Sequence, residues 1–189
     1  MDLGAERAVL AGIFSYGLES YVEVCDIIDS DSFSHKNNQV IFKCIEKIIK
    51  DGAEIDLPSL LSAAKKLDLQ DIINSTQELE YINSLMEYPI KKDNVLYFAA
   101  QIKKFEFARK IKKLTNKIGR DIDDINGDES IDEIINILEN PITDFLREDI
   151  ASKISQFFPN IIITSLDVSQ DIDFNSLIVD INYQVANTK

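Results

Sequence analysis

Glycine is scarce in this chain, and its placement argues against a phosphate-binding loop. Only six of the 189 residues are glycine, at positions 4, 12, 17, 52, 119 and 127, and none is followed by lysine. A phosphate loop needs two spaced glycines with Lys and then Ser or Thr directly after the second. We therefore expect neither nucleotide hydrolysis nor a bound nucleotide cofactor.

Residues that bind metals or act as nucleophiles are equally few. Cys25 and Cys44 are the only cysteines, lie among apolar residues and lack metal-ligand spacing, which predicts buried thiols of a cytoplasmic protein. The single histidine, His35, has no ligand partner at suitable spacing. Two acidic runs, within 121–124 and 167–173, lack the glycine and final glutamate of an EF-hand loop. We expect no catalytic residue, no metal site and no cofactor.

Apolar residues are abundant but form no long uninterrupted run. They make up 45% of the sequence, which is enough for a core, since a domain of ~150 residues buries roughly 70% of its unfolded surface. The runs are too short for a transmembrane helix, and the N-terminal MDLGAERAVL lacks the features of a signal peptide. We expect a cytoplasmic protein with no membrane partner.

Acidic residues outnumber basic ones, and the excess lies in the last third of the chain. The formal net charge is −13. Residues 1–120 hold 17 Lys and Arg against 18 Asp and Glu, a net of −1, whereas residues 121–189 hold 3 against 15, a net of −12. This abrupt change indicates two segments with different histories or environments.

Helical periodicity dominates the first two-thirds of the sequence. Within 38–50, apolar residues recur every three or four positions opposite a lysine-rich face, as in an amphipathic helix with one buried side. Gly52 is suited to end that helix, and Asp56 to cap the next one ahead of Pro58. Phe33 is expected to anchor the polar loop 29–37. Further predicted caps and stops are Asp2, Gly17, Ser20 with Glu23, Ser75 with Glu78, Pro89 and Asp93.

Five segments in order carry a family resemblance. They are AERAVLAGIF (5–14), DSFSHKNNQVIF (31–42), the Gly52 to Leu60 run containing IDLPSL, ELEYINSLMEYP (78–89) and DNVLYFAAQIKK (93–104). Together they resemble the N-terminal domain of DnaB-type replicative helicases. One departure is Asn38, where that family often has histidine. The resemblance implies a helical head with a projecting helical hairpin, self-association as a dimer or hexameric ring, and contact with a primase or helicase loader.

A long basic helix is predicted from Asp93 to about Ile118. Its apolar residues step by threes and fours, and residues 91–120 hold ten basic residues against two acidic ones. One reading is a surface for nucleic acid or an acidic partner. The other is the solvated side of an amphipathic helix, which is favoured because no aromatic residues interleave with the lysines on that face to stack bases. The candidate surface comprises Lys103, Lys104, Arg109, Lys110, Lys112, Lys113 and Lys117.

The C-terminal part differs in kind. A return arm begins at Ile131 and is expected to be interrupted at Asn140-Pro141, because proline lacks the N–H and disfavours helix before it. An amphipathic helix over 145–157 follows, and then alternating residues over 161–166 and 177–185 predict two strands joined by the polar loop 169–176. Helix, Phe-Pro-Asn-Ile, strand, acidic loop and strand over 138–189 resemble the C-terminal half of the phage baseplate wedge and IraD-like family, with Asn160 in place of the usual arginine.

These patterns predict a mainly α protein: a helical head (1–90), a helical hairpin arm (91–139) and a helix with a β-hairpin (140–189). Three readings stay open. In the first, the chain is a non-catalytic interaction module of phage DNA replication that contacts DNA only indirectly. In the second, it is a phage baseplate structural protein found in the virion. In the third, it joins or truncates two reading frames near 136–145.

Overall fold

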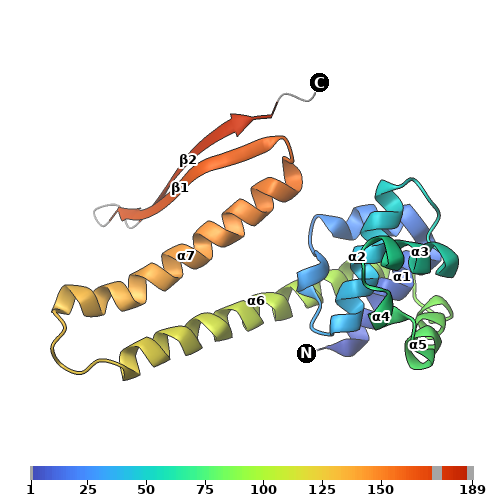
Figure 1. Ribbon diagram of the computed structural model, residues 1–189, viewed down its shortest axis with the longest axis horizontal. Helices are drawn as coiled ribbons and strands as arrows, with labels where there is room; N and C mark the ends of the chain where they lie inside the picture. The colour runs from blue at the N-terminus through green and yellow to red at the C-terminus, as the bar shows by residue number, and fades with distance from the viewer. Residues whose placement is uncertain (1, 172–175, 187–189) are drawn as a thin grey trace. The chain divides into compact units, whose positions relative to one another are not determined.

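The computed structural model describes residues 2–171 and 176–186, and the chain falls into two compact units, Met1–Lys110 and Ile111–Lys189. The predicted mainly α class is confirmed, with a small two-stranded antiparallel sheet near the C-terminus (Figure 1). The predicted strand loop lies in part, at residues 172–175, outside the described residues, as do residues 187–189.

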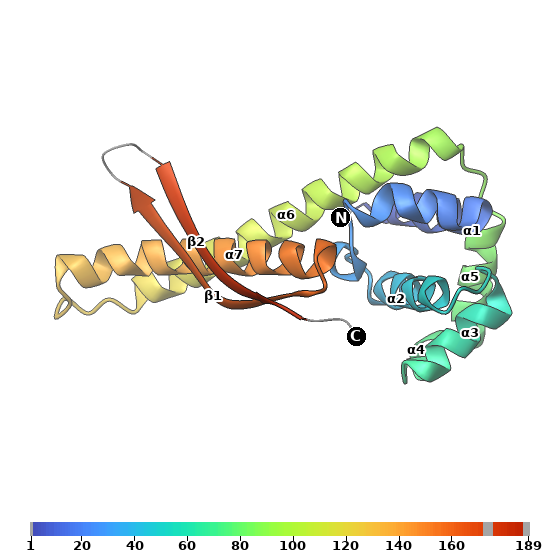
Figure 2. The same cartoon turned by 90° about the horizontal axis from the view of Figure 1, so that it is seen from above.

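The first unit is a helical head built from five helices, a short 3-10 turn and the first part of α6 (Figure 2). Their bounds are α1 Leu3–Cys25, η1 Ser30–Ser32, α2 Lys36–Lys50, α3 Leu57–Lys66, α4 Gln70–Ile73 and α5 Thr76–Met86. The core is formed by α1 to α5 together with the first turns of α6, and Phe33 is buried in it as predicted, with its ring centroid 5.1 Å from that of Phe42. The sequence pattern predicts no helix between residues 67 and 75, where the structure has the short helix α4.

Most predicted caps of the head are present. The Asp2, Asp56 and Ser75 side chains accept from backbone N–H groups at the starts of α1, α3 and α5. Gly17, at φ 61°, kinks α1, and Gly52, at φ 69°, follows α2. These positive φ values explain why both positions carry glycine.

Two predicted caps are wrong. The Ser20 hydroxyl is buried and has no hydrogen-bond partner, because the segment after the Gly17 kink continues as part of α1. Asp93 lies inside the first turn of α6, which begins one residue earlier at Lys92. In both cases the helix starts before the residue chosen as its cap.

The helix α6 spans Lys92–Asp123 and runs through both compact units. Val95, Ala99 and Ile102 of its first turns are buried in the head core. Further along, Phe105 and Ile111 of the same predicted apolar stripe are exposed. The apolar residues of α6 are therefore buried in the head core only over the first three turns of the helix.

The expected interruption at Asn140-Pro141 is wrong, because α7 runs without a break from Ile131 to Phe157. Ser130 and Glu133 form a reciprocal capping box at its start, and the later turns pack against β1. Proline in a helix interior removes one backbone hydrogen bond, and the turns on either side of Pro141 keep the helix. Its continuity removes one argument for a junction near 136–145.

The strands β1 (Ile161–Asp171) and β2 (Ser176–Val185) pair antiparallel. The register pairs Ile163 with Tyr183 and then Ser165 with Asn182, so Thr164 is an extra residue on β1. Strict alternation along β1 is therefore wrong beyond Ile163. The bulge brings Leu166 to the face of Ile163, whereas simple alternation assigned it to the other face.

Among the described residues, α1 is the one helix whose length and composition would allow it to cross a membrane. Its residues Ala8, Val9, Leu10 and Ile13 are buried against other helices of the head. A core helix of a globular domain has the same composition, and the packing assigns α1 to that class.

Candidate protein-interaction surfaces

The basic candidate residues of α6 divide into those that hold the head together and those on its surface. Lys103 and Lys110 pair with the Glu106 carboxylate at 2.8 and 2.9 Å. Arg109 donates to the backbone carbonyl of Ser32. Lys104, Lys112, Lys113 and Lys117 are exposed. Three of the seven candidates therefore have contacts within the chain.

Glu106 is the centre of this contact and was not singled out from the sequence. It is only 3% exposed, and the Ser32 hydroxyl donates to its carboxylate at 2.7 Å. Burial works against the charged form, but hydrogen bonds from Lys103, Lys110 and Ser32 outweigh it and lower the pKa of Glu106 to about 2. The carboxylate thus stays charged at neutral pH and ties α6 to η1.

A second buried carboxylate, Glu6, joins α1 to the loop before α2. It accepts from the Ser34 backbone N–H at 2.6 Å and from the Asn38 amide at 2.7 Å. The Asn38 carbonyl oxygen in turn accepts from the Tyr81 hydroxyl at 2.8 Å. The departure noted at Asn38 is therefore the middle of a buried chain of hydrogen bonds from α1 to α5.

Arg7 lies next to that chain. Its guanidinium carbon is 5.6 Å from the ring centroids of both Tyr81 and Tyr88. A guanidinium within about 6 Å of an aromatic face is attracted to it. Arg7 is therefore a packing residue between α1 and α5.

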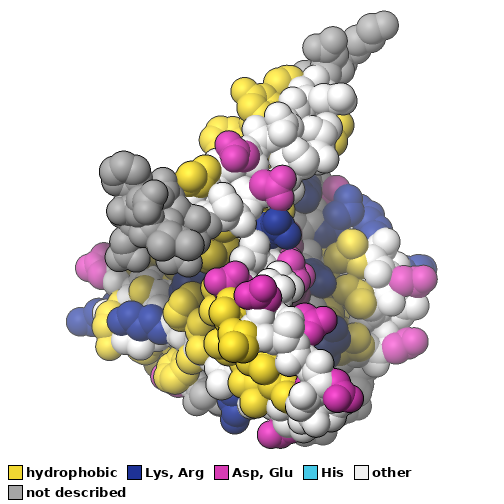
Figure 3. Space-filling view, turned by 90° about the vertical axis from the view of Figure 1, so that its left-hand side faces the viewer, with side chains coloured by type: hydrophobic (Ala, Val, Ile, Leu, Met, Phe, Trp, Pro, Cys, Tyr) yellow, Lys and Arg dark blue, Asp and Glu magenta, His cyan; other side chains and the backbone are white. Residues whose placement is uncertain are grey.

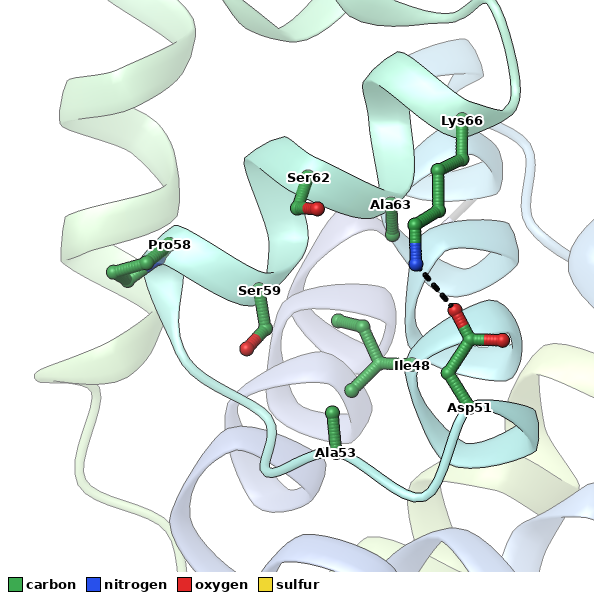
Figure 4. A pocket seen from close by; sticks show the side chains of 8 residues that line it. All are labelled: Ile48, Asp51, Ala53, Pro58, Ser59, Ser62, Ala63 and Lys66. Carbon is green, nitrogen blue, oxygen red and sulfur yellow. Dashed lines mark hydrogen bonds and ion pairs between the residues drawn. The ribbon is translucent and has the colours of Figure 1, made fainter.

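The head carries a small hollow between α2 and α3 (Figure 4), with a volume of about 270 Å³. Lys66 and Asp51 form an ion pair at 2.8 Å along one side, and Ile48 and Ala63 supply apolar wall. A larger hollow of about 520 Å³ lies at the α1 kink, lined by Phe14, Gly17 and Ile55 among others. Neither contains a group arranged for catalysis.

Large apolar side chains are exposed along the second half of α6 and the first half of α7. Figure 3 looks at the molecule from the side of the α6–α7 connection, where hydrophobic side chains gather with acidic ones among them. In the part of the predicted arm (91–139) that these helices form, the exposed large apolar residues are Ile111, Ile122, Ile131, Ile135 and Leu138, and Ile142 follows directly after the arm. Large apolar patches on a protein surface mark interaction sites.

Metal chemistry finds no support in the described residues, where no group of three or more His, Cys, Asp or Glu is placed to hold an ion. Asp173 of the second acidic run lies outside them. Cys44 is buried, and burial raises the pKa of its thiol to about 11.

The described residues form a mainly helical fold, with the long helices α6 and α7 after the helices of the head. The sequence model of the DnaB-like helicase N terminal domain matches residues 1–104, which is more than half of the chain. The chain belongs to this family. The matching model describes the N-terminal domain of the helicase and not its ATPase domain.

A solved structure has the same fold. The crystal structure of the N-terminal domain of DnaB helicase from Mycobacterium tuberculosis aligns with a TM-score of 0.62 at 16% sequence identity, covering 75% of this chain and 96% of that one. A search of curated proteins finds no match. The comparisons give no support to the baseplate wedge resemblance of residues 138–189.

Proposed function

We propose that this chain is a non-catalytic module of DNA replication that self-associates through its arm and binds a primase or a helicase loader. Membership of the DnaB-like N-terminal family supports the general role. The observation that carries the proposal is the series of exposed large apolar side chains on the arm, among them Ile122, Ile131, Ile135 and Leu138.

Self-association explains this exposure physically. Burying apolar surface contributes about 25 cal/mol per Å², and a helix pair with an unburied apolar side gains that free energy by docking on a like helix pair. The family resemblance implies a dimer or hexameric ring. The domain division proposed is head 1–90, arm 91–139 and C-terminal segment 140–189, with the module working in the cytoplasm of a cell, or of a phage-infected host.

Direct binding of DNA is not part of the proposal. Lys103, Arg109 and Lys110 contact Glu106 or Ser32 within the chain. Four exposed lysines remain on α6, and Phe105 and Phe107, which lie between Lys104 and Lys110 in the sequence, are exposed as well. DNA is reached through partners, and the acidic residues after 120 would oppose a phosphate backbone.

Light scattering coupled to size exclusion tests the self-association step. The full chain should elute with a mass that is a multiple of 21.4 kDa. Ile135→Lys places a charge in the exposed apolar surface of α7 and should shift the mass toward 21.4 kDa. Asn136→Lys, an exposed polar neighbour, is the matched control and should keep the assembly.

Two results would contradict the proposal. One is a wild-type chain with the mass of a monomer at every concentration tested. The other is an Ile135→Lys chain with the same mass and circular dichroism as the wild type. The same two variants, Ile135→Lys and Asn136→Lys, also test partner binding. A primase or loader should bind both, because neither substitution lies in the head.

A further inference from the structure

The β-hairpin has one apolar face, and only half of it is covered. After the bulge, Val168 of β1 pairs with Val179 of β2, and Leu166 pairs with Ile181. The helix α7 packs against β1, and Val168 is 7% exposed. Its direct partner Val179 is 40% exposed. The β2 half of the same face is therefore partly exposed, from 37% at Ile181 to 62% at Val185.

The outer edge of β2 is suited to pairing with a further strand. Apolar Val179, Ile181, Tyr183 and Val185 lie on one face, and Asp180 is the only charged residue of Ser176–Val185. The strand contains no proline and no bulge. An edge of this kind is what proteins normally avoid exposing.

The other edge of the hairpin is less suited. On β1 the extra residue Thr164 breaks the regular spacing of backbone groups, and bulges discourage edge pairing. β1 also carries Asp167, which pairs with Arg147 of α7 at 2.9 Å. The two edges therefore differ, and β2 is the open one.

We propose that β2 pairs antiparallel with β2 of a second copy of this chain, across a two-fold axis at Ile181. The apolar and polar residues of β2 alternate, so a pairing that sets odd positions opposite odd positions joins the two apolar faces into one. Centring on Asp180 would set two carboxylates directly opposite each other, which is destabilising. Centring on Ile181 sets Asp180 opposite Asn182 and Val179 opposite Tyr183.

The apolar face of the resulting four-stranded sheet would be covered by the α7 helices of the two copies. Strands lie ~4.8 Å apart, so the two β1 strands would be roughly 14 Å apart. Two α7 helices, each about 10 Å across, cover a sheet of that width side by side. A two-stranded hairpin is marginal in water by itself, and three or more strands are far more stable. The inference is independent of the function proposed for the arm.

Disulfide trapping in the full chain tests the register. The background carries Cys25→Ser, and the native Cys44 is buried. Ile181→Cys places a thiol at the two-fold axis, within the 4.4–6.8 Å Cα separation that a disulfide spans. We expect most of the oxidised chain to migrate as a covalent dimer. Ile178→Cys, on the same strand and similarly exposed at 44%, lies about three residues off the axis and should give at least tenfold less dimer.

Equal cross-linking of the two variants would overturn the proposal. An Ile181→Cys chain that stays monomeric would overturn it as well, and would indicate that the edge of β2 pairs with a strand of another protein. The trap is repeated with Ile135→Lys, which blocks the arm. Retained cross-linking supports β2 as a separate surface, and its loss would show that the contact depends on the arm. Circular dichroism of each variant checks that the chain stays folded.

Discussion

The Ser32 hydroxyl donates a 2.7 Å hydrogen bond to the buried carboxylate of Glu106, 74 residues further along the chain. Lys103 and Lys110 pair with the same carboxylate, and Arg109 donates to the Ser32 carbonyl. This contact holds the part of α6 that belongs to the first unit against η1. It depends on one acidic residue among basic ones.

Replacing Glu106 with glutamine should destabilise the chain by about 2–3 kcal/mol, because it removes the charged acceptor of the hydrogen bonds from Lys103, Lys110 and Ser32. Urea unfolding followed by circular dichroism measures the change. Glu139→Gln, at an exposed position of α7, is the control and should stay within about 0.5 kcal/mol of the wild type. Equal stability of the two variants would show that the Glu106 contact is not structural.

The same carboxylate should make stability depend on pH. Its pKa in the folded chain, about 2, is lowered from the ordinary 4.5. A lowered folded pKa means that the stabilisation is full above about pH 4.5 and is lost as pH falls toward 2. The difference in unfolding free energy between wild type and Glu106→Gln should shrink by up to about 3 kcal/mol over that range. A difference that is constant from pH 7 to pH 3 would contradict this.

Asn38→Leu should be more damaging than its similar volume suggests. The substitution removes the donor to Glu6 and the acceptor for Tyr81, leaving a buried carboxylate short of a partner. We expect a loss of about 2–4 kcal/mol, since orphaned buried polar groups keep their desolvation penalty. Tyr81→Phe removes one of these bonds and should cost about 1 kcal/mol. Chemical denaturation measures the unfolding free energies of the two variants. Equal losses of stability in Asn38→Leu and Tyr81→Phe would contradict the proposed chain of hydrogen bonds.

Two helical glycines should respond in opposite directions to alanine. A Cβ on Gly12 of α1 would overlap the methyl groups of Val95 on α6, whereas a Cβ on Gly119 of α6 meets nothing within 4 Å. Alanine is favoured over glycine in a helix by up to about 1 kcal/mol, so Gly119→Ala should raise the melting temperature. Gly12→Ala should lower it, because overpacking costs about 1–3 kcal/mol. The same sign for both would mean that α1 and α6 do not pack at Gly12.

Local signals in the sequence predicted much of the fold. Asp2, Asp56 and Ser75 cap helices because each is a short polar side chain directly before an apolar pattern. Ser20 has the same spacing and does not cap a helix. The chain is already helical at Ser20, because the second segment of α1 begins directly after the kink at Gly17. Pro141 has a local cost to the helix, from which the sequence predicts an interruption. The capping box at Ser130 and the packing of α7 against β1 stabilise the helix despite that cost.

The contacts of the surface residues could not be predicted in the same way. The lysines of α6 stand at positions typical of a solvated helix face, and nothing near them in the sequence indicates Ser32. Glu106 is an ordinary glutamate by local pattern, and its burial depends on a loop 74 residues away. The bulge at Thr164 cannot be predicted from the alternation of apolar and polar residues along β1, because it depends on how β1 pairs with β2.

Sedimentation equilibrium of the full chain carrying Tyr183→Lys tests the central claim most directly. This substitution charges the β2 surface and leaves the arm intact, so any remaining assembly must use other surfaces. Self-association through the arm predicts a mass of at least 2 × 21.4 = 42.8 kDa, which returns to that of a monomer when Ile135→Lys is added. A mass of 21.4 kDa at all concentrations without the arm substitution would contradict the account.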